Sequence, residues 1–325
     1  MVVKNDVSVD IKEARMKKNK NGDSNIKVKE KGKKNKNSIL TILMFLLPAL
    51  LVYSVFIIYP ILSTINTSLY EWNGIGAEKL FIGLQNYSEL LQDPAFWAAL
   101  KNNMYVILVS IFVQIPLGLV MALILSSRIR GKKLLNVLFF MPYLMSTVAV
   151  GLLWVFIYDP VNGSVNLLLN FLGFESVHWL ASSNTAIIAV LIVIAWQFAP
   201  FFMILFRASM VGIPEELYEA SNIDGANSRE QFFYITLPSL MPTIISSSIL
   251  AVVGSLKTFD IFFVMLGGGS GNTTEILGTY MFRQSFVNFN MGYGSTIATM
   301  MLILALISVV VIQFIDFRRK KREAL

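Results

Sequence analysis

The feature that most constrains this chain is a set of six long apolar stretches. Each has about the 20 residues that a helix needs to cross the hydrocarbon core of a bilayer. Lipid offers the backbone no hydrogen-bond partners, so such segments cross as helices. The stretches are residues 39–64, 104–126, 134–158, 185–210, 240–266 and 295–316. The sequence therefore predicts an all-α, polytopic membrane protein with six transmembrane helices.

The composition supports this prediction and excludes several kinds of site. Of the 325 residues, 55% are hydrophobic and 14% are charged, whereas soluble domains carry about 25% charged residues. The chain has no cysteine and a single histidine, His178. Disulfides, thiolate clusters and multi-histidine metal sites are therefore excluded, and we expect neither a metal nor a cofactor.

The basic residues are distributed unevenly, which predicts the orientation of the chain. Cytoplasmic segments of membrane proteins are enriched in Lys and Arg. Residues 1–38 hold twelve of the 27 basic residues, the segments after the second, fourth and sixth stretches hold eleven more, and the opposite loops hold three. We therefore expect a multi-pass protein of the plasma or inner membrane with both termini in the cytoplasm, ending in a short basic segment, 318–325.

The tail of residues 1–38 has its own character. It is rich in Lys, Asn and Gly and has no apolar period, which is typical of a disordered segment. A basic tail can bind nucleic acid, but no aromatic residue interleaves its lysines. We expect it to contact anionic lipid and not nucleic acid.

One cytoplasmic loop, residues 213–238, carries a local pattern. Pro214 suits a first helical position, and two glutamates follow it in the first turn. Gly225 stands where a helix ends in a left-handed residue. Asn227 and Glu230 have the spacing of a capping box for a second helix, which a proline then ends before the fifth stretch. The loop therefore predicts two short helices joined at a glycine.

These residues also carry a resemblance to a known family. Glu219-Ala220-Ser221, three residues, Gly225, nine residues and Ile235-x-Leu237-Pro238 resemble the EAA loop of binding-protein-dependent ABC importer permeases. The family usually has a second alanine where this chain has Ser221. Two further segments resemble carbohydrate permeases of the maltose type: Phe81-Ile-Gly-Leu-Gln-Asn-Tyr87, and Lys257-x-Phe259-Asp260 followed by Gly267-Gly268-Gly269, where proline is commoner than Gly269.

The resemblance implies a type I ABC importer permease fold over residues 39–317 and the import of a di- or oligosaccharide. It implies that ATP hydrolysis occurs on another subunit. The implied partners are a second permease, two copies of a cytoplasmic ATPase and an extracytoplasmic solute-binding protein. In the family this loop docks on the ATPase, whose closure on ATP turns the permease pair from inward- to outward-open. The expected coupling residues are Glu219, Ala220, Ser221, Asp224, Gly225, Leu237 and Pro238.

Polar and aromatic residues inside the apolar stretches are candidates for the solute path. Charge within a membrane is costly, which makes Lys257 and Asp260 notable. They are three residues apart on one expected helix, so they should face one side and can pair. An anchoring ion pair and a role in the path both remain open. The tentative path residues are Trp154, Tyr158, Trp196, Gln197, Ser247, Lys257 and Asp260, although interface belts and interhelical hydrogen bonds also use such residues.

Other functions remain open on the residues alone. An importer of glycerol phosphate or another polar solute would show the same patterns. An ion-coupled secondary transporter needs acidic or histidine relays within its helices, and Asp260 is the only intramembrane acid well away from the ends. A membrane-embedded enzyme needs paired carboxylates, a Ser–Lys dyad or a metal cluster, and the sequence shows no convincing one. We therefore expect a transport protein that is not itself an enzyme.

Overall fold

The structure is a computed structural model that describes residues 36–76, 78–127, 129–267 and 274–323. Most of the expected disordered tail, together with Gly268 and Gly269, lies outside the described residues. The chain divides into two compact units, residues 1–57 and 58–325. Within the first unit lie the helix α1 (Lys36–Tyr53) and most of the π-helical segment η2 (Ser54–Ile58).

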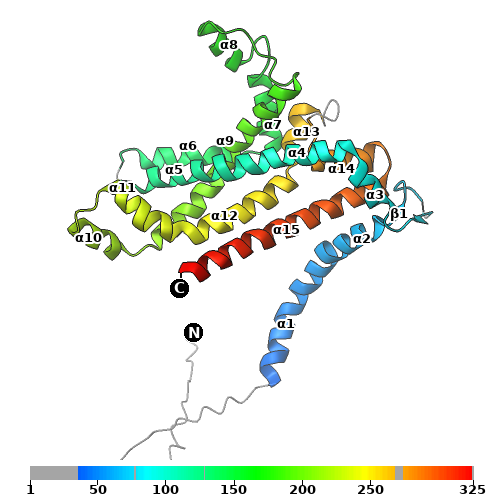
Figure 1. Cartoon of the computed structure of the whole chain (residues 1–325), viewed down its shortest axis with the longest axis horizontal. Helices are drawn as coiled ribbons and strands as arrows, with labels where there is room; N and C mark the ends of the chain where they lie inside the picture. The colour runs from blue at the N-terminus through cyan, green and yellow to red at the C-terminus, as the bar shows by residue number, and fades with distance from the viewer. Residues whose placement is uncertain (1–35, 77, 128, 268–273, 324–325) are drawn as a thin grey trace, which may run out of the picture. The chain divides into compact units, whose positions relative to one another are not determined.

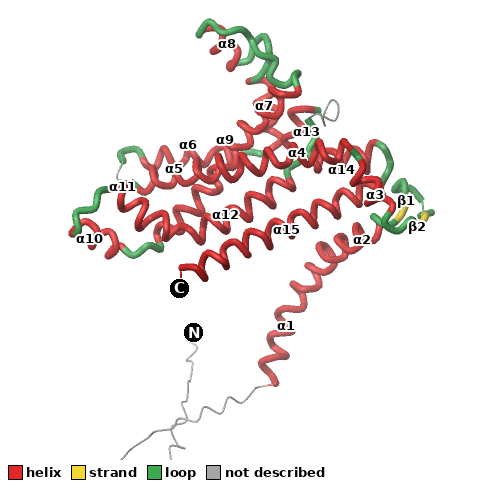
Figure 2. The backbone as a smooth tube through the Cα atoms, viewed as in Figure 1, coloured by secondary structure: helices red, strands yellow, loops and turns green. Residues whose placement is uncertain are grey.

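The regular secondary structure in the described part of the second unit is helical apart from one small hairpin (Figures 1 and 2). The two strands of the hairpin pair antiparallel, with Tyr70 opposite Phe81. The elements are α2 (Tyr59–Thr67), β1 (Tyr70–Glu71), β2 (Leu80–Phe81), α3 (Gln85–Gln92), α4 (Pro94–Val109), η3 (Ser110–Gln114), α5 (Ile115–Ser126), α6 (Lys132–Leu144), α7 (Thr147–Ile157), α8 (Ser164–Phe171), α9 (Ser183–Val211), α10 (Glu215–Ile223), α11 (Ser228–Gln231), η4 (Phe232–Thr236), α12 (Leu237–Lys257), α13 (Asp260–Leu266), α14 (Leu277–Phe282), η5 (Arg283–Val287) and α15 (Met291–Glu323).

Among the described residues, five helical stretches are long and apolar enough to cross a membrane. A bent helix pair makes a sixth if it is counted as one span. The five are Met44–Thr67, Pro94–Ser126, Thr185–Val211, Ser228–Lys257 and Met291–Arg322, and the pair is Lys132–Leu144 with Thr147–Ile157. The predicted all-α membrane architecture is therefore confirmed, with breaks that the sequence did not indicate.

The third predicted span is not one helix. α6 and α7 meet at an angle of 99°, and Met145 and Ser146 between them have ψ angles of 146° and 134°. The carbonyl of Met145 accepts a hydrogen bond from the side chain of Gln197 at 3.4 Å. The expectation of a single helix over 134–158 was wrong, because an apolar run does not reveal a break whose backbone groups a neighbouring helix satisfies.

The fifth predicted span also breaks. α12 ends at Lys257, and α13 begins at Asp260. These two residues therefore do not share a continuous helix, and among the described residues neither belongs to an ion pair. The predicted Lys257–Asp260 pair was wrong, because three residues of spacing bring side chains together only where the helix is unbroken.

Packing in the second unit centres on α9 and α15. α9 packs against α5, α6 and α12, and α15 packs against α2, α12 and α14. α5 approaches α9 closely through Gly118, where an added Cβ would lie 2.7 Å from the Cβ of Phe202. Small residues allow such contacts between membrane helices. Figure 1 shows α10 and α11 at one end of this bundle and α3, α14 and the hairpin at the opposite end. We call these the coupling end and the far end.

Candidate functional site: the coupling loop and the far-end polar cluster

The coupling loop, residues 213–238, begins with α10. The helix starts at Glu215 with Pro214 as its N-cap residue, one position later than expected. Gly225 follows the helix with φ +81°. The N–H of Gly225 donates to the carbonyl of Asn222 at 3.2 Å, and the N–H of Ala226 donates to that of Ser221 at 2.9 Å. This pair of bonds is the Schellman arrangement that ends helices, so the predicted left-handed glycine is confirmed.

The second helix of the loop starts with the predicted capping box. The side-chain oxygen of Asn227 accepts from the backbone N–H groups of Arg229 and Glu230, each at 3.0 Å. The carboxylate of Glu230 accepts in return from the N–H of Asn227 at 2.7 Å. The side chains of Asn227 and Glu230 thus accept from backbone N–H groups that the start of a helix leaves unpaired.

Pro238 does not end this second helix. α11, η4 and α12 form one helical stretch of 30 residues, Ser228–Lys257. In an α-helix, the ring of Pro238 would clash with the carbonyl of Tyr234. Tyr234 lies within the π-helical segment η4, where the N–H of Leu237 bonds instead to the carbonyl of Phe232. The expected stop was wrong because this change of hydrogen-bond register lets the helix continue through the proline.

Polar side chains fasten α10 to this long helix. The side-chain amide of Gln231 donates to Ser221 at 2.9 Å and to Asn222 at 2.8 Å. The hydroxyls of Tyr218 and Thr236 lie 2.9 Å apart in a hydrogen bond. Ser221 therefore faces its own molecule. The outward surface of α10 carries exposed side chains instead, including Glu219, Asp224, Leu217 and Ile223, the last being 88% exposed.

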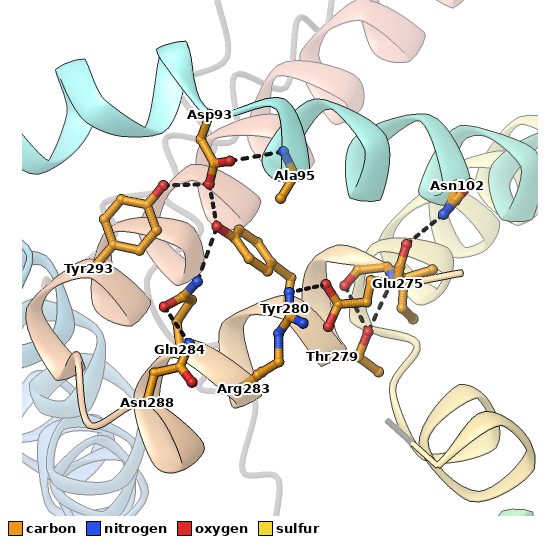
Figure 3. Close-up of polar contacts among 11 residues, drawn as sticks. Asp93, Ala95, Asn102, Glu275, Thr279, Tyr280, Arg283, Gln284, Asn288 and Tyr293 are labelled. Carbon is orange, nitrogen blue, oxygen red and sulfur yellow. Dashed lines mark hydrogen bonds and ion pairs between the residues drawn. The ribbon is translucent and has the colours of Figure 1, made fainter. Parts of the chain in front are cut away.

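The far end is organised around Asp93 (Figure 3). Asp93 is the N-cap residue of α4, and one carboxylate oxygen accepts from the N–H of Ala95 at 2.8 Å. The other oxygen accepts from the hydroxyls of Tyr280 and Tyr293, the latter at 2.8 Å. Burial alone would raise the pKa of Asp93, but the hydrogen bonds from the two tyrosines and the backbone hold it below its usual value. One carboxylate thus joins α4, α14 and α15.

Glu275 and Arg283 form an ion pair beside this cluster. Their closest atoms lie 2.6 Å apart, and the Glu275 side chain is fully buried. Burial raises the pKa of Glu275 to about 7, although Arg283 opposes the rise and Asp93 adds to it. One carboxylate oxygen of Glu275 is buried without a hydrogen-bond partner in the described structure. The side chain of Asn102 donates to the backbone carbonyl of Glu275 at 2.7 Å.

The far-end cluster borders an open polar cleft of about 420 Å³. The residues that line it are Glu89, Asp93, Ala95, Tyr280, Arg283, Gln284, Asn290 and Tyr293. They come from α3, the start of α4, α14, η5 and the start of α15. The cleft holds two carboxylates, and its one guanidinium, that of Arg283, is paired with Glu275. Its charge is therefore acidic on balance.

A second cavity, of about 270 Å³, lies beside the end of α12 and is almost entirely apolar. Its lining residues are Val253, Leu256, Lys257, Met281, Ala298, Met301, Leu302 and Ala305. Lys257 is the one charged residue among them and is exposed. Asp260 begins α13, whose main packing partner is α7. The structure thus separates the two charged residues of the tentative path.

The aromatic residues of the tentative path gather in one cluster. The ring of Trp154 lies 5.1 Å from that of Tyr158 and 5.6 Å from that of Trp196. Trp179, from the loop after α8, stacks near Tyr158 at 5.5 Å. Tyr158 is only 3% exposed, and its hydroxyl donates to the carbonyl of Ala189. Within the described chain, this cluster is part of the packed core.

Three polar atoms of the tentative path residues are buried without partners in the described structure. They are the indole N–H of Trp154, the side-chain oxygen of Gln197 and the hydroxyl of Ser247. Buried polar groups without partners are uncommon in folded proteins and call for an explanation. In a subunit of a larger assembly, a partner helix or a solute can supply the missing bond.

The sequence of the chain matches the model of a known protein family. The model of the binding-protein-dependent transport system inner membrane component matches residues 114–321, which include the whole coupling loop. The chain belongs to this family. Members of the family are permease subunits of ABC importers, so this permease is not the subunit that hydrolyses ATP.

Curated relatives and solved structures agree with this assignment. The permease is 37% identical to the probable ABC transporter permease protein YurN of Bacillus subtilis, over 81% of this chain and 91% of that protein. It is 35% identical to the trehalose/maltose transport system permease protein MalF of Thermococcus litoralis, over 85% and 94%. A crystal structure of a bacterial ABC transporter of alginate matches with a TM-score of 0.77 at 21% identity, covering 87% of this chain and 96% of that chain. That likeness confirms the predicted fold.

The far-end cluster of the permease was not predicted. Tyr280 and Tyr293 lie 187 and 200 positions from Asp93, so no local spacing connects them. One local signal was available, because an aspartate directly before a proline is typical of an N-cap and first helical residue. It would have located the start of α4, but not the tyrosines that Asp93 binds.

Proposed function

We propose that this permease imports a di- or oligosaccharide, supplies half of the translocation path and is driven by a separate ATPase. Relatives named for sugar transport support the solute class. They include the trehalose/maltose permease of Thermococcus litoralis at 35% identity and the arabinooligosaccharides permease AraP of Bacillus subtilis at 31% identity. The observation that carries the coupling role is the coupling loop, a pair of capped helices joined at a left-handed Gly225.

The coupling loop suits docking on a cytoplasmic ATPase. α10 has no buried residue, and its exposed surface mixes acidic and apolar side chains, including Glu219 and Ile223. The hydrogen bonds of Gln231 and Tyr218 hold α10 against the long helix that carries α12. A push on α10 would therefore move that helix with it. In this reading Glu219, Ala220 and Asp224 contact the ATPase, whereas Ser221, Gly225, Leu237 and Pro238 shape the loop.

The distribution of basic residues supports an orientation with both termini and the coupling end in the cytoplasm. The far end then faces outward, where an extracytoplasmic solute-binding protein arrives. The acidic cleft bordered by Asp93 and Glu89 suits a basic side chain of that protein. The alginate transporter of similar fold has been crystallised with its alginate pentasaccharide-bound periplasmic protein. A second permease completes the path.

The solute path is proposed to run beside the unpaired polar groups. Gln197 and Ser247, both buried, and the partly buried Trp154 have hydrogen-bonding atoms without partners in the described chain. Trp196, beside Trp154, and the exposed Lys257 are proposed to belong to the same path, with Tyr158 supporting the aromatic cluster and Asp260 near its outer end. A solute or the second permease would supply the missing hydrogen bonds.

Uptake by the complex reconstituted in vesicles tests the proposal. We expect ATP-dependent accumulation of maltose, trehalose or an arabino-oligosaccharide, stimulated by the binding protein and unaffected when ion gradients are collapsed. Glycerol phosphate serves as the competing polar solute. Uptake that requires a proton or sodium gradient and not ATP would overturn the importer assignment, and accumulation of glycerol phosphate alone would overturn the sugar assignment.

A double variant, Lys257→Met with Asp260→Leu, tests the charged residues of the path. We expect the KM for uptake to rise tenfold or more if these groups meet the solute, because each hydrogen bond to a charged group contributes about 1.5–3 kcal/mol. Lys101→Met, at an exposed lysine of α4, is the control. An unchanged KM in the double variant would remove both residues from the path.

A further inference from the structure

A buried side chain from another helix binds both sides of the break that ends α12. Asn103 lies on α4 and is fully buried. Its amide N–H donates to the carbonyl of Ser255 at 2.9 Å, near the last turn of α12. Its amide oxygen accepts from the N–H of Leu277 at 2.7 Å, at the first residue of α14. One amide therefore satisfies the carboxyl end of one helix and the amino end of another.

The N–H of Leu277 needs a partner outside α14, whereas the carbonyl of Ser255 also accepts from the N–H of Thr258 at 3.3 Å. Helices leave carbonyls unpaired at their ends and N–H groups unpaired at their starts. Ser255 and Leu277 are buried, so these groups find their partners within the protein and not in water. The bonds also fix the orientation of the Asn103 amide, since only its nitrogen can donate and only its oxygen can accept.

A second contact holds the same point of α12. The hydroxyl of Ser255 donates to the hydroxyl of Ser110, at the start of η3, at 2.9 Å. Both serines are buried, with 3% exposure each. α14 also lies close to the break, since a Cβ added to Gly278 would come within 2.9 Å of the carbonyl of Thr258. The end of α12, the start of α14 and α4 thus form one packed junction.

The opposite end of this helix is the coupling loop. Ser228–Lys257 is one helical stretch of 30 residues, which spans roughly 45 Å at 1.5 Å per residue. At its start, Gln231 and Thr236 bind α10 through the hydrogen bonds described above. The stretch is therefore hydrogen-bonded near both of its ends. Three side-chain bonds join its start to α10, and Asn103 of α4 and Ser110 of η3 bind it near its end.

We propose that Asn103 is a positioning residue that transmits the movement of the coupling loop to the far end of the permease. When the ATPase displaces α10, the long helix moves, and Asn103 makes α4 and α14 follow. Without that bond the helix slides past its neighbours, and ATP hydrolysis no longer produces a full opening of the path. This inference rests on the proposed function, because it assumes that an ATPase acts on α10.

Asn103→Asp is the sharpest test. The variant keeps the oxygen that accepts from Leu277 but turns the donor toward Ser255 into an acceptor. In the complex reconstituted in vesicles, we expect uptake to fall roughly fivefold or more while binding-protein-stimulated ATPase activity stays within about twofold of wild type, because losing one buried hydrogen bond costs roughly a factor of ten in an equilibrium. Asn103→Ser is a milder variant for the case in which Asn103→Asp does not assemble.

Asn166→Asp is the matched control. Asn166 is also a fully buried asparagine, but its side chain bonds within the segment 159–179, away from the junction. We expect this variant to keep the wild-type ratio of uptake to ATP hydrolysis. Equal losses of uptake and ATPase activity in both Asn103 variants, or no loss in either, would overturn the inference. A wild-type complex whose ATPase ignores the binding protein would instead overturn the proposed function.

Discussion

The two ends of this permease are stabilised in different ways. At the coupling end, most of the hydrogen bonds that shape the loop join residues close in sequence, such as Asn227 with Glu230 and Ser221 with Ala226. At the far end, Asp93 binds Tyr280 and Tyr293, which are 187 and 200 positions away. The coupling end is thus formed mainly by local contacts, whereas the far end forms only when two distant parts of the chain have come together.

The two ends are therefore expected to have different roles in transport. The coupling loop is a compact local module with an exposed surface, so a partner can push it without unfolding it. The far end is a network of charged and phenolic groups that bridges α4, α14 and α15. Such a network favours the movement of these helices as one block. Substitutions in the coupling loop should therefore affect coupling, and those in the cluster around Asp93 should affect stability and docking.

The largest expected effect is at Gly225. Its φ of +81° is costly for any side chain with a Cβ, by about 1–2 kcal/mol, and a β-branched residue suits it least. We expect Gly225→Val to lower binding-protein-stimulated ATPase activity and uptake tenfold or more, because the loop loses the shape that fits its partner. Both rates are measured in the complex reconstituted in vesicles.

Gly173→Val is the matched control for that prediction. Gly173 has a φ of +83° and, like Gly225, open space where a Cβ would lie, but it is located after α8. The backbone strain is therefore the same, and only the position differs. Wild-type rates in Gly225→Val, or equal losses in both variants, would contradict a special role for the coupling loop.

The next largest effect is expected at Asp93. Asp93→Asn keeps a side chain that can cap α4 but removes the charge that strengthens the two tyrosine bonds. We expect a loss of about 1–3 kcal/mol in the free energy of unfolding, seen as a Tm lowered by several degrees in detergent. Asp159→Asn is the control, since the carboxylate of Asp159 accepts only from local backbone N–H groups in the described structure. An equal drop in Tm for both variants would argue against the network.

A smaller effect is expected from Glu89→Arg at the acidic cleft. The substitution reverses one charge of the cleft, so a basic side chain of the binding protein should bind less well. We expect the concentration of binding protein that half-saturates ATPase stimulation to rise a few-fold, and less at high salt. Glu175→Arg reverses an exposed charge after α8, outside the cleft. A shift of the same size there would show that general charge, and not the cleft, is responsible.

The smallest effect is expected from the pH dependence of stability at Glu275. Its pKa is about 7 in the folded protein and near 4.5 when unfolded, so the folded state holds this proton more tightly. The stabilisation is complete below pH 4.5 and is lost as the pH rises through 7. We expect the difference in unfolding free energy between wild type and Glu275→Gln to shrink by on the order of 1 kcal/mol between pH 5 and 8. The change is measured as a smaller difference in Tm between the two proteins. A constant difference would contradict the raised pKa.

The sequence predicted features that depend on local hydrogen bonds and missed those that depend on distant residues. Gly225 and the Asn227–Glu230 box were predictable because the backbone groups at these helix ends bond to residues two to five positions away. Pro238 misled because its effect depends on the hydrogen-bond register of η4, which the sequence does not display. The bend after Leu144 and the break after Lys257 were missed because side chains from other helices, those of Gln197 and Asn103, bind backbone carbonyls there.

The apolar stretches, the two-helix coupling loop and the family resemblance could be predicted from the sequence, although two of the six stretches form broken helices. These depend on hydrophobic length and short-range hydrogen bonds, which are properties of neighbouring residues. The packing of the helices determines where α12 ends and places Lys257 and Asp260 on separate helices. It also brings Asp93 and Asn103 to the helices far away in the chain that they bind. Those outcomes depend on which distant side chain hydrogen-bonds to each backbone group or carboxylate, and these bonds form only when the helices pack.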